Sequence, residues 1–139
     1  MRRNLSIDDL NGLLDEPLIA VIGTYRKDGT VLLSPLWFEW QDGTFVVVSP
    51  LEGVKAKHVR RDPRASIVVY EQGRPFRGVE ATCTATIETE HVHETHLRVA
   101  TRYLGAEDGA SFAERKGRGQ SVIRLTPVKL RAWDYKGEI

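Results

Sequence analysis

The sequence is poor in the features that mark secreted and membrane proteins. Cys83 is the only cysteine among 139 residues, so no internal disulfide can form and a disulfide-stapled secreted domain is excluded. The first residues lack the apolar stretch of a signal peptide. No apolar run approaches the ~18 to 20 residues that span a bilayer, since the longest runs, residues 18–23 and 45–48, have the length of strands. We therefore expect a cytoplasmic protein with no membrane partner.

Net charge and sequence motifs for catalysis are also sparse. The chain contains twenty Lys and Arg and nineteen Asp and Glu. The resulting net charge of +1 argues against nucleic acid as a partner. The chain contains no G-x-S-x-G motif, no P-loop and no G-x-G-x-x-G motif. Serine hydrolysis, nucleotide hydrolysis and Rossmann-type dinucleotide binding therefore have no basis in the sequence.

The composition that is present belongs to one ordinary folded domain. Hydrophobic residues make up 41% and charged residues 28%, which excludes a disordered or fibrous chain. A compact domain needs roughly 100 to 150 residues, so a chain of 139 leaves no material for a second core. Residues 1–139 are predicted to form a single domain.

Short β-branched runs separated by turn signals predict an antiparallel sheet. Asp28-Gly29 and Asp42-Gly43 are typical of tight hairpin turns and separate the first three runs. The predicted strands are residues 18–24, 30–40, 44–49, 65–71, 79–88 and 121–135, the last broken at Pro127. Six or seven antiparallel strands with short helices indicate a mainly β fold, a small barrel that avoids unpaired sheet edges.

Four segments carry signals of short helices. Ser6 is an N-cap candidate for a helix that ends before Pro17. Residues 53–62 contain helix formers and stop at an Asp-Pro pair, where the proline restricts the preceding residue. Residues 90–104 and 108–117 each end at a glycine, which is the commonest helix stop.

Residues 53–64 carry a strong local charge. The block contains five cationic side chains and one carboxylate, which gives it a net charge of +4 before His58 is counted. Basic residues at the start of a short helix can hold a phosphate or a carboxylate through their side chains and the free helix amides. A solvated helix face is an equally good interpretation. The cations are Lys55, Lys57, Arg60, Arg61 and Arg64, and Arg74 and Arg77 follow in the next loop.

Two further positions suggest a ligand groove. Pro35 interrupts an apolar strand, and proline is tolerated in a sheet only at an edge or a bulge. We expect the sheet to open there, with Trp37 and its neighbours lining a groove for a flat ligand, although packing in the core or a dimer interface explains the same pattern. Trp133 alternates with apolar residues and points away from the barrel interior, which is typical of interface or pocket residues.

The histidines and the cysteine do not predict a catalytic site. On a helix, His91 and His93 point in nearly opposite directions, and the spacing of His93 and His96 is one residue short of the zincin motif. We therefore expect a solvated helix face and no metal site. Cys83 lies on the small apolar face of its predicted strand, so an inert core thiol is expected.

The order of residues resembles a known family. The runs LIAVIGTYRKDGTVLLSPLWFEW, VKAKHVRRDPRASIVVYE, PFRGVEATCTATI and VKLRAWDY are similar to the split-barrel flavin-binding proteins of the pyridoxamine 5′-phosphate oxidase class. More narrowly, they resemble the branch that binds the deazaflavin coenzyme F420. The resemblance covers about residues 10 to 135 and is sharpest in the K-x-K-x-x-x-R-D-P-R block.

The resemblance implies a split β-barrel homodimer with two cofactor sites at the subunit interface. It implies that Lys55 and Lys57 bind the cofactor's phosphate and tail, and that Trp133 closes the site of the other subunit. The recurring position Tyr103 has no clear role. The cofactor-binding residues implied in this way are Ser34, Pro35, Leu36, Trp37, Ser49, Pro50, Lys55, Lys57, His58, Arg77, Gly78, Val79 and Trp133.

The chain also departs from the pattern of its relatives. Pyridoxamine phosphate oxidases proper carry a C-terminal substrate-binding segment that this sequence lacks, and His58 stands where many relatives have asparagine. The basic block and the near full-length resemblance lead us to expect an F420-dependent oxidoreductase that transfers a hydride between the deazaflavin and a small planar unsaturated substrate. An FMN-binding oxidoreductase of the same fold is the close alternative, and a non-catalytic binder of a flavin or a tetrapyrrole is a third.

Overall fold

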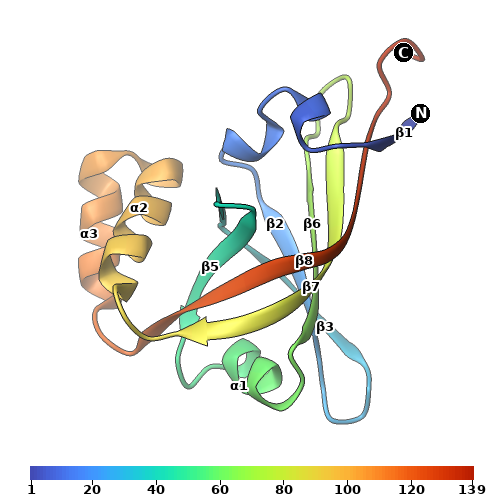
Figure 1. The fold of residues 1–139 in the computed structure, drawn as a ribbon. Coiled ribbons are helices and arrows are strands. Elements are labelled where there is room, and N and C mark those ends of the chain that lie inside the picture. Colours follow the sequence, from blue (N-terminus) through green and yellow to red (C-terminus); the bar gives the residue numbers. More distant parts are fainter.

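The computed structural model describes residues 1–139, which form one antiparallel sheet and three α-helices (Figure 1). Two short 3-10 turns, η1 (Asp8–Leu10) and η2 (Leu13–Asp15), precede most of the sheet. The strands are β1 (Arg2–Leu5), β2 (Ala20–Tyr25), β3 (Val31–Leu36), β4 (Glu39–Gln41), β5 (Thr44–Pro50), β6 (Arg64–Tyr70), β7 (Gly78–Glu88) and β8 (Gln120–Asp134).

The strands follow the order β3-β2-β6-β7-β8-β5-β4, and β1 pairs with β8. All pairs are antiparallel, and β3 and β4 are not hydrogen bonded to each other, so the sheet stays open. The sheet nevertheless curls until the end of β3 and the end of β5 face one cavity. The predicted antiparallel split barrel is confirmed, and Pro35 lies on the edge strand β3, as its missing amide requires.

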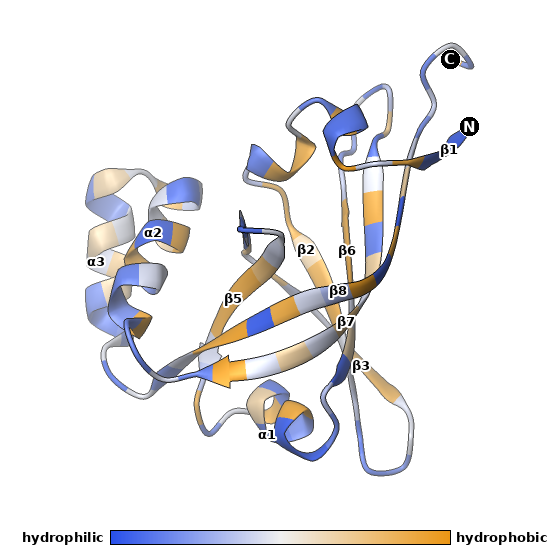
Figure 2. Ribbon diagram, in the orientation of Figure 1, coloured by the Kyte–Doolittle hydropathy of each residue, from blue (hydrophilic) through white to orange (hydrophobic).

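The core lies inside the curl of the sheet. Nineteen buried residues form one cluster, which includes Ile22, Phe38, Phe45, Ile67 and Leu125. Strand β7 alternates between this buried inner face and the outer face. Strands β5 and β8 contain consecutive buried residues, and apolar colour runs along β2, β5 and β8 in Figure 2. The alternation fixes the register, because a slip by one residue would turn the whole apolar set outward.

Three α-helices flank the sheet, and all three confirm the sequence predictions. Helix α1 (Val54–Arg61) joins β5 to β6, and α2 (Val92–Leu104) and α3 (Ala106–Lys116) form a hairpin beside β5 and β8 (Figure 1). Gly109 lets α2 and α3 approach closely, since a Cβ there would lie 2.8 Å from the backbone of Thr101. None of these helices has the length and apolar character needed to cross a membrane.

The N-terminal region differs from the prediction. The expected helix before Pro17 is the pair of 3-10 turns η1 and η2, because Asn11 and Gly12 both adopt left-handed backbone angles (φ 52° and 80°). The predicted capping hydroxyl of Ser6 instead binds the carboxylate of Asp9 at 3.0 Å. Strand β1 was not predicted, and together with the separate β4 it raises the strand count to eight.

Strand β8 is continuous where a break at Pro127 was predicted. Thr82 of β7 pairs with Lys129 and Cys83 pairs with Pro127, so Val128 is an extra residue with no partner. Its side chain is 72% exposed. A bulge of this kind absorbs the missing proline amide and lets the strand continue with increased twist.

Candidate functional site

A groove of about 360 Å³ lies where the two ends of the sheet approach each other. Pro35, Leu36 and Trp37 at the end of β3 form one wall, and Val48 and Pro50 of β5 form another. The structure therefore brings four of the sequence-predicted site residues, Pro35, Leu36, Trp37 and Pro50, to one hollow. Ser34 is half-buried and does not line the groove.

The α2–α3 hairpin supplies the third wall of the groove. His96 and Val99 of α2 and Phe112 and Lys116 of α3 face it. None of these residues was selected from the sequence. The sequence did contain a pattern that predicts the buried side of α2. This side includes His96, Val99, Ala100 and Tyr103, whose spacing is that of a helix stripe that packs against the core.

Trp37 is held in place by an aromatic cluster. Its ring stacks on Tyr103 at 5.0 Å with an interplanar angle of 9°, and it tilts against Phe112 at 5.1 Å. The Tyr103 hydroxyl donates a hydrogen bond to the Leu18 carbonyl at 2.5 Å and accepts one from the Phe38 amide at 3.1 Å. Burial raises the pKa of Tyr103, so the hydroxyl stays protonated at neutral pH. Tyr103 therefore fixes the aromatic wall.

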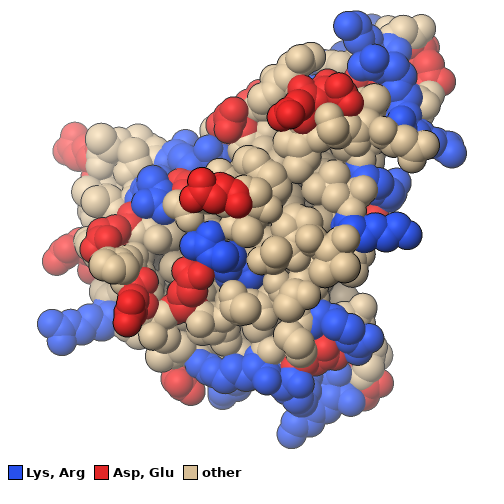
Figure 3. Space-filling view, viewed as in Figure 1, with Lys and Arg blue, Asp and Glu red and all other residues tan.

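The start of α1 is suited to an anion. Gly53 precedes the helix and offers no side-chain cap, and the first turn contains no acidic residue. The first amides of a helix lack partners within the helix and carry the positive end of its dipole. Lys55 and Lys57 form no ion pair, and both lie within the first turns. In Figure 3 basic side chains gather at the α1 end of the molecule.

The three arginines of the same block are already engaged. Arg60 donates to the Leu51 carbonyl at 2.8 Å, and Arg61 donates to the carbonyl of Tyr25. Arg64 pairs with Asp62 at 2.7 Å and holds the pKa of that carboxyl down at about 2. The structure thus separates two free lysines from three cations that stabilise the α1 region.

Ser49 and Pro50 end the strand that leads into α1. The Ser49 hydroxyl is buried and has no hydrogen-bond partner, and it is the one fully buried side-chain polar atom in that condition. Ser121 donates to the Ser49 carbonyl at 2.9 Å. An unpaired buried hydroxyl is unfavourable by about 1 to 3 kcal/mol and is satisfied by any polar group that reaches it. Ser49 does not line the groove and its hydroxyl is fully buried, so the uncapped α1 start, and not this hydroxyl, is open to a phosphate-bearing ligand.

His58 lies on the core side of α1, away from Lys57. Its side chain is buried, and its Nδ1 is 2.9 Å from the Thr24 hydroxyl. Burial lowers the pKa of His58, and the positive charges of Arg61 and Arg26 lower it further. His58 thus anchors α1 to β2.

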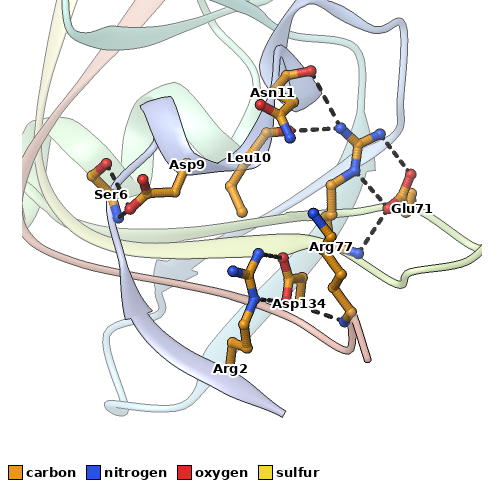
Figure 4. A network of polar contacts seen from close by, with 9 residues as sticks. Arg2, Ser6, Asp9, Leu10, Asn11, Glu71, Arg77 and Asp134 are labelled. Atoms are coloured by element: carbon orange, nitrogen blue, oxygen red, sulfur yellow. Dashed lines mark hydrogen bonds and ion pairs between the residues drawn. The ribbon is translucent and has the colours of Figure 1, made fainter. Parts of the chain in front are cut away.

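Arg77 is the centre of a polar network near the N-terminus (Figure 4). Its guanidinium pairs with Glu71 at 2.7 Å and with Glu16 at 2.9 Å, and it donates to the Leu10 carbonyl at 2.6 Å. Hydrogen bonds from the Arg77 side chain and backbone lower the pKa of Glu71, and the Arg77 charge lowers it further. Arg77 could reach a ligand only by giving up these contacts. Its neighbour Val79 is fully buried in the core.

Trp133 covers Gly78 on the outer face of the sheet. The two residues pair across β7 and β8, and Arg131 lies 4.8 Å from the centre of the Trp133 ring. Its outward position confirms the predicted strand alternation. Leu36 of β3 is in register, through β2, β6 and β7, with Ala132 of β8, which precedes Trp133. This path crosses four strand spacings, or about 19 Å along the sheet. The Trp133 of one chain therefore does not line that chain's own groove.

The remaining candidates form no metal or thiol site. No group of three or more His, Cys, Asp and Glu side chains is arranged to hold a metal ion. His91 and His93 are exposed, as predicted, whereas His96 is buried and faces the groove. Burial raises the pKa of Cys83 to about 12, so this thiol is protonated at neutral pH.

A family model described as pyridoxamine 5′-phosphate oxidase matches residues 7–134. The match extends from the N-terminal turns to the last residue of β8 and includes the groove, α1 and Trp133. Among curated protein sequences, none matches the chain.

Many solved structures share the fold, and three of them illustrate their similarity to this chain. A conserved hypothetical protein from Mycobacterium tuberculosis is 23% identical, with 95% of this chain and 86% of that chain covered and a TM-score of 0.79. An F420 reductase is 22% identical over 86% of this chain and 93% of that chain, with a TM-score of 0.70. A FAD-binding protein from Mesorhizobium loti is 19% identical over 94% and 93%, with a TM-score of 0.68.

Proposed function

The chain belongs to the pyridoxamine 5′-phosphate oxidase family, and from this premise we propose that it is an F420-dependent oxidoreductase. The family match supports a flavin-type cofactor, and one neighbour of the same fold is an F420 reductase. The observation that carries the proposal is the pair of free lysines, Lys55 and Lys57, at the uncapped start of α1. F420 bears both a phosphate and an acidic tail, so it offers two anionic groups to this basic helix start.

The residues of the chain would bind, orient and shield the cofactor. The ring would lie against Pro35 and Trp37 in the groove, and the phosphate would lie at the α1 start beside Lys57. The aromatic wall of Trp37, Tyr103 and Phe112 would exclude water from one side of the ring. When bound, the deazaflavin supplies hydride transfer to a small planar unsaturated substrate, which is why the chain needs no acid/base motif of its own.

We further propose that the working unit is a homodimer. Large apolar residues are exposed on the outer face of β2, β3 and β6 or next to it. Their exposed fractions include 67% for Leu33, 48% for Ile19 and 47% for Tyr70. An apolar patch of this kind marks an interaction surface. Pro35 lies on the same face of β3 as Leu33, so a second copy seated there would border the groove. The partner subunit's Trp133 would then supply the wall that the single chain lacks.

Sedimentation or light scattering of the purified protein tests this assembly. We expect a dimer of about twice the 15.7 kDa chain mass. Leu33→Lys should convert it to a monomer with the fold retained, because a buried lysine without a partner opposes association. A wild-type protein that is monomeric at all concentrations would refute the dimer.

Binding isotherms with F420 and FMN test the cofactor. We expect tighter binding of F420, and equal or tighter binding of FMN would refute that preference. FMN is the second candidate, because a phosphate at a basic helix start does not distinguish the two cofactors and one neighbour is a FAD-binding protein. Protein purified from a host that makes FMN but no F420 gives a further readout, since a yellow colour favours FMN.

The Lys57→Ala variant tests the site. Loss of a charge-assisted phosphate contact costs about 1.5 to 3 kcal/mol, so Kd should rise by about 10- to 150-fold. Lys27→Ala is the matched control, since Lys27 lies exposed in the turn between β2 and β3, does not line the groove, and its removal changes the net charge equally. Equal binding by both variants would show that Lys57 makes no phosphate contact.

A further inference from the structure

His96 is the one histidine of its helix that turns inward. It is 5% exposed, and its ring stands edge-on to Phe112 at 5.8 Å with an interplanar angle of 87°. Burial lowers the pKa of His96, and the positive charge of Lys116 and the neighbouring His93 lower it further. The imidazole is therefore neutral near pH 7 and offers one hydrogen-bond donor and one acceptor.

This buried imidazole makes no hydrogen bond within the chain. The Ser49 hydroxyl is the only fully buried side-chain polar atom without a partner. The ring nitrogens of His96, which also lack a partner, must therefore retain some accessible surface. Because His96 lines the groove on one side and a second cavity of about 550 Å³ on the other, that surface faces these two hollows.

The surroundings place His96 among a few polar groups in a groove with largely apolar walls. Pro35, Trp37, Val99 and Phe112 present carbon surface to the ligand space. Polar groups are added by His96, by Gln120, which lines both cavities, and by the Lys116 ammonium, which lies 5.4 Å from the Phe112 ring centre. Pockets that bind flat organic ligands combine apolar walls with a few fixed polar groups in this manner.

We propose that His96 is a ligand-binding residue that hydrogen-bonds the carbonyl and ring-nitrogen edge of the heteroaromatic ring lying against Trp37. A flavin or deazaflavin ring has such an edge, with both donors and acceptors. The neutral imidazole can serve either kind of atom. The inference rests on the proposed function, because it assigns a contact within the same site. It gives the α2–α3 hairpin a direct part in ligand selection.

Binding isotherms of four proteins with F420 and with FMN test this assignment. His96→Leu removes both nitrogens and keeps an apolar side chain on the buried side of α2, so Kd for the preferred cofactor should rise about tenfold. His96→Gln retains a donor and an acceptor and should bind within about threefold of the wild type. His93→Gln is the matched control, because His93 is exposed one turn away and does not line the groove. Its Kd should equal that of the wild type.

The outcomes separate this inference from the proposed function. Wild-type affinity in His96→Leu, combined with weakened binding in Lys57→Ala, would overturn the His96 contact and leave the cofactor site standing. A wild-type protein that binds neither cofactor would overturn both. If His96→Leu unfolds, NMR of the wild type decides: cofactor should shift the His96 imidazole signals and leave those of His93 in place, and an unshifted His96 would refute the contact.

Discussion

The contact between Gly78 and Trp133 gives a sharp prediction about stability. A Cβ on Gly78 would lie 2.3 Å from Cζ2 and 2.5 Å from Cε2 of the Trp133 indole. Carbon atoms in contact are normally about 3.5 to 4.0 Å apart, so Gly78→Ala must displace the ring by more than about 1 Å. Overpacking of this size costs about 1 to 3 kcal/mol. For a chain of this length we expect the melting temperature to fall by about 3 to 12 °C.

Urea unfolding followed by circular dichroism measures the loss, and tryptophan emission of the native state reports movement of the ring. Gly73→Ala is the control, because a Cβ at Gly73 meets no atom within 4 Å and its backbone is not left-handed. Its stability should stay within about 0.5 kcal/mol of the wild type. In a Trp133→Ala background the Gly78→Ala cost should disappear, since neighbouring sites are not additive. Equal costs of Gly78→Ala with and without the indole would refute the packing argument.

Two further predictions concern the groove wall and acid sensitivity. Tyr103→Phe keeps the stack on Trp37 but removes the hydroxyl that bridges Leu18 and Phe38. The free energy of unfolding, measured by urea titration, should therefore drop by about 1 to 2 kcal/mol. An unchanged free energy would show that water replaces the bridge. The native pKa of His58 is lowered below its ordinary 6.5, so the unfolded chain binds more protons and stability should fall as the pH drops below about 6.5. His58→Asn should flatten this slope in unfolding titrations at pH 7.5, 6.0 and 5.0, and an unaltered slope would show that His58 is not the sensitive group.

Local chemistry made much of the fold predictable. The Asp-Gly turns and the alternation within β7 are set by neighbouring residues, and the structure follows them. Strand β1 was not predictable in this way. Arg2–Leu5 is short and polar, and it becomes a strand because Arg2 forms an ion pair with the buried carboxylate of Asp134, 132 residues away (Figure 4).

The candidate site was predictable where the backbone sets it. Pro35 marked the edge of the sheet because a missing amide has only a few allowed places. Charge alone could not distinguish the free Lys57 from Arg77, whose partners Glu16 and Glu71 come from separate segments. His96 was missed because it was grouped with two exposed histidines, although its spacing from Val99 and Tyr103 marks the buried face of α2.

The place of β8 in the sheet bears on the order in which the chain can fold during synthesis. Strand β8 pairs with β1, β5 and β7, yet it follows all of them in the sequence. Until it leaves the ribosome, β3-β2-β6-β7 and β4-β5 remain two separate pieces, each with an unsatisfied edge and apolar residues open to water. Contacts of such long sequence separation slow folding, and unpaired edges invite aggregation. The last strand therefore acts as the closing step of assembly, and damage to it should lower soluble yield more than equal damage to β3.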